Sequence, residues 1–190
     1  MTEQQEYRVL ETRGIVELRE YAPHVVATVL ASGSPEAAAS EAFRPLFGYI
    51  SGVNLRAAAL AMTAPVIQEP AGERLPMTAP VIHRPAGVER WAVSFVLPGG
   101  RGIEGYPEPT DLRVSLRAVP REEAAALGWS GSWTAENVAR WTEELRRRIA
   151  EAGWQEAGEA RWARFDPPMR PPSQRRNEIV IPVTRVPRAH

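Results

Sequence analysis

The chain contains an internal repeat, whose second copy follows the first after 98 residues. Each copy reads as a strand, a short turn, a second strand, a Ser-Gly-Ser turn and a helix. A fixed offset that preserves identical residues and apolar positions indicates duplication of one supersecondary unit. The chain of 190 residues is therefore expected to form one domain, residues 1–190, with pseudo-repeats at about 7–97 and 112–184. The matching pairs are 16–19 with 114–117, Ala27 with Ala125, 32–34 with 130–132, Phe43 with Trp141, and Phe47 with Leu145.

A helix closes each copy of the repeat. The first is expected at residues 35–50, because Ser34 is a suitable N-cap and Pro35 suits the first helical position. Pro45 predicts a kink or an early end, since a proline inside a helix removes one hydrogen bond. The second helix is expected at residues 135–152. Apolar residues recur at helical spacing in both: Ala39, Phe43, Leu46 and Ile50 in the first, and Val138, Trp141, Leu145 and Ile149 in the second.

Strands account for most of the remaining regular structure. A second, shorter repeat lies between the two halves, where residues 62–67 (MTAPVI) recur as 77–82. Each copy is expected to form one strand of a hairpin, and its proline places it beside an opening and away from the sheet centre. Apolar runs predict the other strands at residues 7–11, 15–21, 25–30, 91–97, 112–119, 160–165 and 178–183.

The composition excludes several kinds of catalytic site. The chain has no cysteine, which removes thiolate metal sites, disulfides and cysteine nucleophiles. It also has no lysine, so all 23 basic residues are arginine and no Schiff base can form. His24, His83 and His190 have no metal-binding spacing, and the sequence contains no phosphate loop or nucleophile elbow. These features favour a binding protein over an enzyme.

Charge and hydropathy bear on partners and location. The formal net charge is zero, which gives no electrostatic reason to expect nucleic acid as a partner. The N-terminus is polar and carries no signal peptide, and no apolar run approaches the roughly 18 residues of a membrane span. A cytoplasmic location is therefore expected.

The kind of site that remains is a binding site, formed by an apolar, methionine-containing cleft near several arginines. Met62 and Met77 hold equivalent positions in the short repeat, and methionine adapts well to flat apolar ligands. Arg44, Arg56 and Arg74 lie near these segments and could meet carboxylates. Plain core packing of the methionines and solvated surface arginines are the alternative interpretation of the same residues.

Several short motifs, taken in chain order, resemble one known family. They extend over nearly the whole chain, from about Tyr7 to Thr184. The motifs are residues 17–23 (ELREYAP), 43–52 (FRPLFGYISG), 61–66 (AMTAPV), 93–98 (VSFVLP), 163–168 (ARFDPP) and 175–178 (RRNE). As an ordered set they resemble the SOUL/haem-binding protein family.

The resemblance implies an α+β fold, in which duplicated β-rich halves form a distorted antiparallel β-barrel flanked by two long helices. It also implies that haem or another tetrapyrrole binds in an apolar cleft beside the first helix, and that the proline-rich loop at residues 166–172 lies near its mouth. The protein would then be a carrier, buffer or sensor. The residues expected to hold the macrocycle are Phe43, Leu46, Phe47, Met62 and Met77, with Arg56 meeting the propionates.

The sequence assigns no iron ligand. Some family members have a histidine in the segment that corresponds to Arg19–Tyr21, where this chain has Glu20. We therefore expect the apolar walls to dominate binding. The remaining candidate ligands, none of them marked by spacing, are Met62, Met77, His24, His83 and Tyr49.

Two other interpretations remain open. The duplicated architecture also resembles gyrase-inhibitor-like domains, which bind varied small molecules and in some cases hydrolyse them. In such a site Glu17, Glu20 or Tyr21 could act as acid or base. A third interpretation is a partner-binding module that uses the proline-rich loop at residues 166–172.

Overall fold

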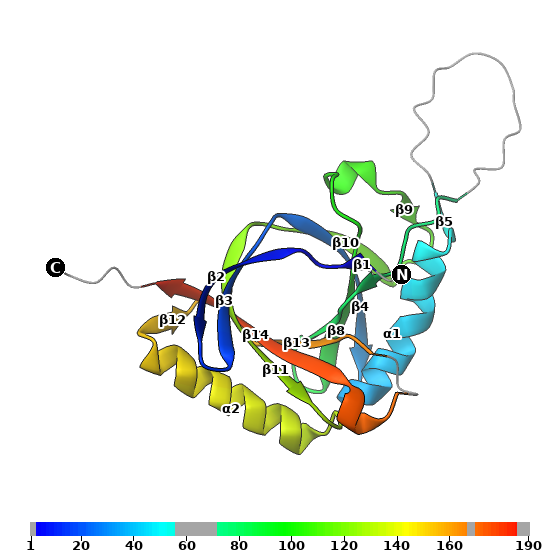
Figure 1. Cartoon of the computed structure of the whole chain (residues 1–190). Coiled ribbons are helices and arrows are strands. Elements are labelled where there is room, and N and C mark those ends of the chain that lie inside the picture. Colours follow the sequence, from blue (N-terminus) through cyan, green and yellow to red (C-terminus); the bar gives the residue numbers. More distant parts are fainter. Residues whose placement is uncertain (1–2, 56–71, 167–169, 186–190) are drawn as a thin grey trace, which may run out of the picture.

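The computed structural model of the protein describes residues 3–55, 72–166 and 170–185. They form an α+β fold with one large antiparallel sheet and two long helices (Figure 1). Two short strand pairs lie outside the large sheet: β1 (Glu3–Gln4) with β6 (Thr78–Ala79), and β5 (Asn54–Leu55) with β9 (Glu108–Pro109). The large sheet comprises β2 (Tyr7–Arg13), β3 (Val16–Tyr21), β4 (His24–Ser32), β7 (Val81–Pro85), β8 (Arg90–Val96), β10 (Val114–Val119), β11 (Glu122–Ser130), β12 (Trp154–Glu156), β13 (Arg161–Arg164) and β14 (Arg176–Arg185).

The strand order of the large sheet is β10-β4-β8-β7-β13-β14-β11-β3-β2, with β12 paired to β14. Val114 of β10 lies opposite Val29 of β4, and Val16 of β3 lies opposite Leu127 of β11. Each residue of the first pair corresponds to one of the second through the 98-residue offset, so the two strand pairs have the same register. Strands β7 and β13 join the two sets at the centre of the sheet.

The large sheet curls around a central axis, which gives it a concave and a convex face (Figure 1). Its first and last strands in the pairing order, β10 and β2, are not paired with each other in the described part of the chain. The closed barrel that the family resemblance implies is therefore not found among these strands. The register of β2 against β3 shifts between Val9 and Glu11. Such bulges are common at sheet edges, where they end regular pairing.

Both helices pack against the convex face, at separate places (Figure 1). They are α1 (Pro35–Ile50) and α2 (Ala135–Glu151), close to the predicted bounds. The hydroxyl groups of Ser34 and Thr134 each accept a hydrogen bond from a backbone N–H in the first turn, which confirms the predicted N-caps. Neither helix is long and apolar enough to cross a membrane, nor is any other described helix.

The expected early end of α1 at Pro45 is wrong. The helix contains Pro45 and continues to Ile50. Leu46, Tyr49 and Ile50 follow the proline and are buried against the sheet, so packing stabilises the last turn. Tertiary burial here outweighs the hydrogen bond that the proline removes.

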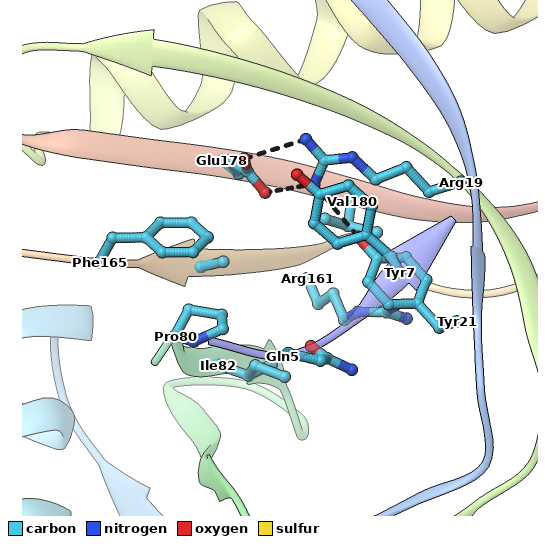
Figure 2. Close-up of a pocket in the computed structure, with 11 residues that line it drawn as sticks. Gln5, Tyr7, Arg19, Tyr21, Pro80, Ile82, Arg161, Phe165, Glu178 and Val180 are labelled. Atoms are coloured by element: carbon cyan, nitrogen blue, oxygen red, sulfur yellow. Dashed lines mark hydrogen bonds and ion pairs between the residues drawn. The ribbon is translucent and has the colours of Figure 1, made fainter. Parts of the chain in front are cut away.

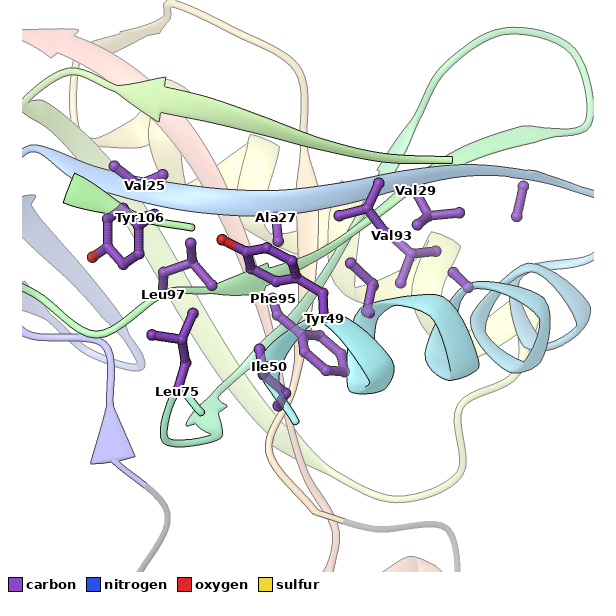
Figure 3. Close-up of a cluster of buried hydrophobic side chains, with 14 of the residues drawn as sticks. Val25, Ala27, Val29, Tyr49, Ile50, Leu75, Val93, Phe95, Leu97 and Tyr106 are labelled. Atoms are coloured by element: carbon purple, nitrogen blue, oxygen red, sulfur yellow. The ribbon is translucent and has the colours of Figure 1, made fainter. Parts of the chain in front are cut away.

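Two hydrophobic cores lie between the helices and the convex face. The first fills the space between α1 and strands β4, β8 and β10, and includes Tyr49 and Phe95 (Figure 3). The second lies between α2 and strands β3, β11, β13 and β14. Trp91 packs against both. The concave face carries two small apolar clusters, around Tyr21 and around Val26, beside charged side chains such as Arg19 and Glu178.

The short repeat does not form the hairpin that the sequence predicts, as far as it is described. Its first copy, residues 62–67, lies outside the described residues. In the second copy, β6 pairs with β1, and β7 lies at the sheet centre between β8 and β13. The expectation that this segment avoids the sheet centre is therefore wrong. Pro80 directly precedes β7, so its missing N–H removes no hydrogen bond within that strand.

Candidate functional site

One side of α1 carries a pair of aromatic rings that are not covered by the core. Phe43 and Phe47 lie one turn apart and stack, with ring centroids 5.6 Å apart and an interplanar angle of 11°. Their side chains are 45% and 47% exposed. Phe43 also contacts the buried ring of Phe95 edge-on at 5.9 Å, which anchors the pair to the sheet. Clustered, half-exposed aromatic rings mark a candidate binding surface.

The residues predicted to line the tetrapyrrole cleft do not all lie on one surface. Phe43 and Phe47 come together, whereas Leu46 is fully buried in the core beneath α1 and cannot line a cleft. The small residues Ala38 and Ala42 share its core-facing side, which turns the two phenylalanines outward. Met77 precedes β6 and is 36% exposed. Met62 and Arg56 lie outside the described residues.

An arginine lies on the same convex face, two strands from Phe95. Phe95 lies opposite Val81, and Val81 lies opposite Arg164, so the three side chains share one face of the sheet. The guanidinium of Arg164 lies 5.4 Å from the Trp133 ring and forms no ion pair in the described part of the chain. Burial and the nearby charge of Arg175 lower the pKa of Arg164, and the carboxylate of Glu36 on α1 partly offsets this shift. Such an arginine is suited to an anionic group on a ligand.

The candidate iron ligands do not present a free donor beside the phenylalanine pair. His83 is 1% exposed, and neither ring nitrogen has a described partner. The ring nitrogens of His24, on the concave face, lie 2.9 Å from the Ala22 carbonyl and 3.1 Å from the Gln5 amide. The Tyr49 hydroxyl donates to a backbone carbonyl at 2.9 Å. Among the described candidates, only Met77 is exposed as a soft donor.

The concave face holds a second group of polar residues, centred on a buried arginine (Figure 2). Arg19 donates to both carboxylate oxygens of Glu178, at 2.7 and 3.1 Å, and to Glu17 at 2.7 Å. Its guanidinium lies 4.0 Å from the centroid of the Tyr7 ring. The adjacent cavity has a volume of about 20 Å³, room for one water molecule. Its other lining residues include Gln5, Tyr21, Pro80, Ile82, Arg161 and Phe165.

Burial and charge together keep the two phenols of this concave group protonated and its central arginine charged. Burial raises the pKa values of Tyr7 and Tyr21, which Arg19 partly offsets, so both phenols stay protonated at neutral pH. Burial alone would lower the pKa of Arg19. The hydrogen bonds from Arg19 to Glu178 outweigh this effect, so the pKa of the guanidinium is raised. The carboxylates of Glu17 and Glu178 are both engaged by Arg19. The described residues therefore offer no free general base here.

Comparison with known proteins places the chain in a family. The model of the SOUL heme-binding protein family matches residues 2–182. The chain belongs to this family. No curated protein matches this SOUL-family chain.

Solved structures similar to the SOUL-family protein include two domains of other kinds. One is the C-terminal domain of EcmrR, with 13% identity and a TM-score of 0.59, where the match covers 95% of this chain and 99% of that one. Another is a hydrolase from Listeria innocua, with 12% identity and a TM-score of 0.62, covering 92% and 94%. At these identities the likeness shows the fold alone.

Two further regions of the SOUL-family protein were singled out by the sequence. Glu20 pairs with Arg8 and Arg121 at 3.0 and 3.2 Å. Because neighbouring strand residues point to opposite faces, Glu20 is separated from the concave site that holds Arg19 and Tyr21. In the proline-rich loop, Asp166 pairs with Arg170 and accepts the backbone N–H of Arg176 at 2.7 Å, while residues 167–169 lie outside the described residues.

The Arg19–Glu178 pair is the main feature that sequence reasoning missed. Its two residues are 159 positions apart, and β3 and β14 are separated by β11 in the sheet. A signal existed in the alternation of β14, where Glu178, Val180 and Pro182 share one face while Ile179, Ile181 and Val183 share the other. A charged residue on a strand buried on both faces requires a partner, but the sequence does not say which one.

Proposed function

We propose that this SOUL-family protein binds haem or a related tetrapyrrole against the exposed aromatic side of α1, and that it serves as a carrier, buffer or sensor of that ligand. One observation carries the proposal. Phe43 and Phe47 form a stacked, half-exposed pair, in a chain that belongs to a family of heme-binding proteins.

The aromatic pair fits the flat face of a macrocycle. A phenylalanine side chain buries roughly 150–250 Å² when fully covered, and nearly half of each ring is still open to solvent. Covering both rings would therefore contribute about 4 kcal/mol at roughly 25 cal/mol per Å², before ordering costs and before the ligand's own buried area is added. Apolar contact alone can support binding on this surface.

Other groups of the chain fit the rest of a haem in part. When bound, haem would supply an iron centre with a strong Soret absorption. Arg164 is suited to one haem propionate because it has no carboxylate partner among the described residues. Arg56 remains a proposed partner for the second propionate. Met77 is the exposed soft donor. With His83 buried and His24 on the other face, we propose a macrocycle held mainly by its faces.

A haemin titration followed by the Soret band tests this proposal. Wild type should give a saturable, sharpened band, and Phe47→Asp should weaken binding by at least about tenfold, because a carboxylate would enter the apolar wall. Val88→Asp is the matched control, since Val88 is an exposed apolar residue in the turn between β7 and β8. Iron-free protoporphyrin should bind comparably. Equal affinity of Phe47→Asp and wild type would contradict the proposal.

A second candidate function is a gyrase-inhibitor-like small-molecule domain, with its site on the concave face. The shared fold with the EcmrR domain and the Listeria hydrolase supports it, as does the group of Tyr7, Arg19 and Glu178. The geometry favours binding over hydrolysis, because both carboxylates there already accept from Arg19. A thermal-shift screen of small molecules with wild type and Tyr7→Ala separates this candidate from the first, since Tyr7 lines the concave face and α1 packs on the convex face.

We also propose that the two halves descend from one duplicated unit. The identical registers of β10–β4 and β3–β11, and the equivalent positions of α1 and α2 after β4 and β11, support it. Superposition of the two halves in an experimental structure tests the idea.

A further inference from the structure

The concave face contains a second cavity, separate from the one beside Arg19. Ile82 and Arg161 line both and form the partition between them. The second cavity has a volume of about 210 Å³, against about 20 Å³ for the first. Its other lining residues are His24, Val26, Arg84, Ser94, Arg117, Val119, Glu122, Gly158, Glu159 and Pro182.

The charges that line this cavity are not balanced by pairs. Arg161 pairs with Glu122, and both side chains are mostly buried, so that pair is internally neutral. Arg84 and Arg117 have no ion pair or hydrogen bond through their side chains in the part of the chain that the structure describes. Glu159 lies exposed at the rim. The cavity is therefore lined by two arginines without a described partner, Arg84, which is partly buried, and Arg117, which is exposed.

The curl of the sheet brings these two arginines together. Arg84 lies on β7 and Arg117 on β10, and two strands, β8 and β4, separate them in the pairing order. They nevertheless interact across the concave side: burial lowers the pKa of Arg117 most, and Arg84 and Arg161 lower it further, while Glu122 raises it. The field at Arg117 is therefore positive, and an anion between the two guanidiniums would relieve it.

The rest of the cavity lining includes apolar residues and the polar side chain of Ser94. Val26, Ile82 and Val119 form the apolar part, and Val26, Ile82 and Val96 pack together behind it. The hydroxyl of Ser94 lies 2.8 Å from that of Thr28, so the two share one hydrogen bond and Ser94 keeps capacity for another. A ligand with a short apolar part and at least one anionic end would match both kinds of wall.

We propose that this cavity binds a small organic carboxylate, whose carboxylate group lies between Arg84 and Arg117 and whose apolar part contacts Val26 and Val119. Arginine is the side chain best suited to planar, bidentate recognition of carboxylates. A cavity of about 210 Å³ suits a ligand of about the size of butyrate or succinate. A haem is far too large for it.

This site is independent of the proposed haem surface. Ile82 and Ser94 line the cavity, whereas their chain neighbours Val81 and Phe95 face α1 on the convex side. Strand alternation therefore separates the two surfaces by the thickness of the sheet. A saturating concentration of the small carboxylate should leave the haemin titration unchanged, so either proposal can fail without the other.

Isothermal titration calorimetry with butyrate, succinate and inorganic phosphate tests the proposal. We expect butyrate or succinate to bind wild type with a Kd at or below about 1 mM, and phosphate to bind more weakly because it has no apolar part. Arg84→Gln and Arg117→Gln should each weaken carboxylate binding at least tenfold. Arg90→Gln is the matched control, since Arg90 is an exposed arginine on β8 that does not line the cavity. It should bind like wild type.

Thermal unfolding without ligand provides an independent readout. Arg117→Gln should be at least as stable as wild type, because it removes one of two neighbouring like charges, and it should lose the stabilisation that added carboxylate gives wild type. The proposal is overturned if no carboxylate binds wild type, if phosphate binds as tightly as the carboxylates, or if Arg90→Gln weakens binding as much as Arg84→Gln.

Discussion

His83 of β7 lies directly opposite Trp162 of β13, where the two sets of strands meet at the sheet centre. Trp133 packs against the His83 ring, with centroids 5.7 Å apart, and the imidazole is 1% exposed. Neither ring nitrogen has a hydrogen-bond partner among the described residues. Because burial without a partner disfavours the charged imidazolium, this histidine makes the centre of the sheet sensitive to pH.

Stability should fall in acid because of His83. Burial, and to a smaller extent Arg164, lower the pKa of folded His83 to about 4, whereas an unfolded histidine titrates near about 6.5. Between these values the unfolded chain binds a proton that the folded protein does not. The free energy of unfolding should therefore fall as pH falls, by up to about 1.4 kcal/mol per pH unit, and His83 should add no dependence at higher pH. Urea denaturation across this range measures the slope.

The variant His83→Leu isolates this effect. It removes the titrating group and the unpartnered nitrogens, so the slope between about pH 6.5 and 4 should flatten, and stability at neutral pH should stay the same or rise. His24→Leu is the control. Burial also lowers the pKa of His24, so His24→Leu should flatten the acid slope too. Because the ring nitrogens of His24 have partners, this variant, unlike His83→Leu, should lose stability at neutral pH. An unchanged acid slope in His83→Leu would show that other groups cause it.

Arg19 should be the arginine on the concave face whose loss is most destabilising. Arg19→Met would leave the carboxylates of Glu178 and Glu17 without their shared partner, and breaking a buried ion pair in this way costs about 3–5 kcal/mol. Arg8→Gln breaks an exposed pair with Glu20 and should cost under about 1 kcal/mol. Urea denaturation of both variants makes the comparison. The double variant Arg19→Met with Glu178→Leu should recover stability, and no recovery would contradict this account.

The sequence predicts the secondary structure well where local signals are strong. Ser34 and Thr134 mark the helix starts because capping chemistry is local, and the 98-residue repeat predicts the matching strand–strand–helix units. Strand β11 is less evident, since its sequence EEAAALGWS has the composition of a helix. It forms a strand because β3 and β14 flank it and satisfy its backbone groups.

The location of a binding surface was less predictable. Apolar spacing places Phe43 and Leu46 on one face of the helix, but Ala38 and Ala42 pack against the sheet and leave Phe43 half-exposed. Spacing alone does not distinguish a small core residue from a small surface residue. The arginines of the concave face come from strands far apart in the chain, and only the curl of the sheet brings Arg84 near Arg117.

Truncation of two neighbouring residues of α1 should change the free energy of unfolding by very different amounts. Leu46 is fully buried, so Leu46→Ala should lower the free energy of unfolding by about 2–5 kcal/mol. Phe47 is half-exposed, so Phe47→Ala should change stability by under about 1 kcal/mol. Urea denaturation measures both. A large loss in Phe47→Ala would mean that the aromatic pair is structural and would weaken the case for a binding surface there.

Histidine ligation should contribute little to haem binding. His83 lies beneath Trp133 with a depressed pKa, and a ligand could reach it only by displacing that ring. His24 is on the concave face, across the sheet from α1, and both of its ring nitrogens have partners. We therefore expect haemin affinity to change by less than about tenfold, or roughly 1.4 kcal/mol, in His83→Ala and in His24→Ala. The shape of the Soret band should also change little.

The same titration on Phe47→Asp and Phe43→Asp supplies the contrast. A charge placed in the apolar wall must be desolvated when the macrocycle covers it, so both variants should bind at least tenfold more weakly than wild type. Circular dichroism and urea denaturation confirm that each variant is folded before its spectrum is compared. A hundredfold loss in either histidine variant, with near-normal binding by Phe47→Asp, would instead mean that axial ligation holds the haem. For His83 this would require the sheet centre to open, which faster hydrogen exchange of the β7 and β13 amides on binding would reveal.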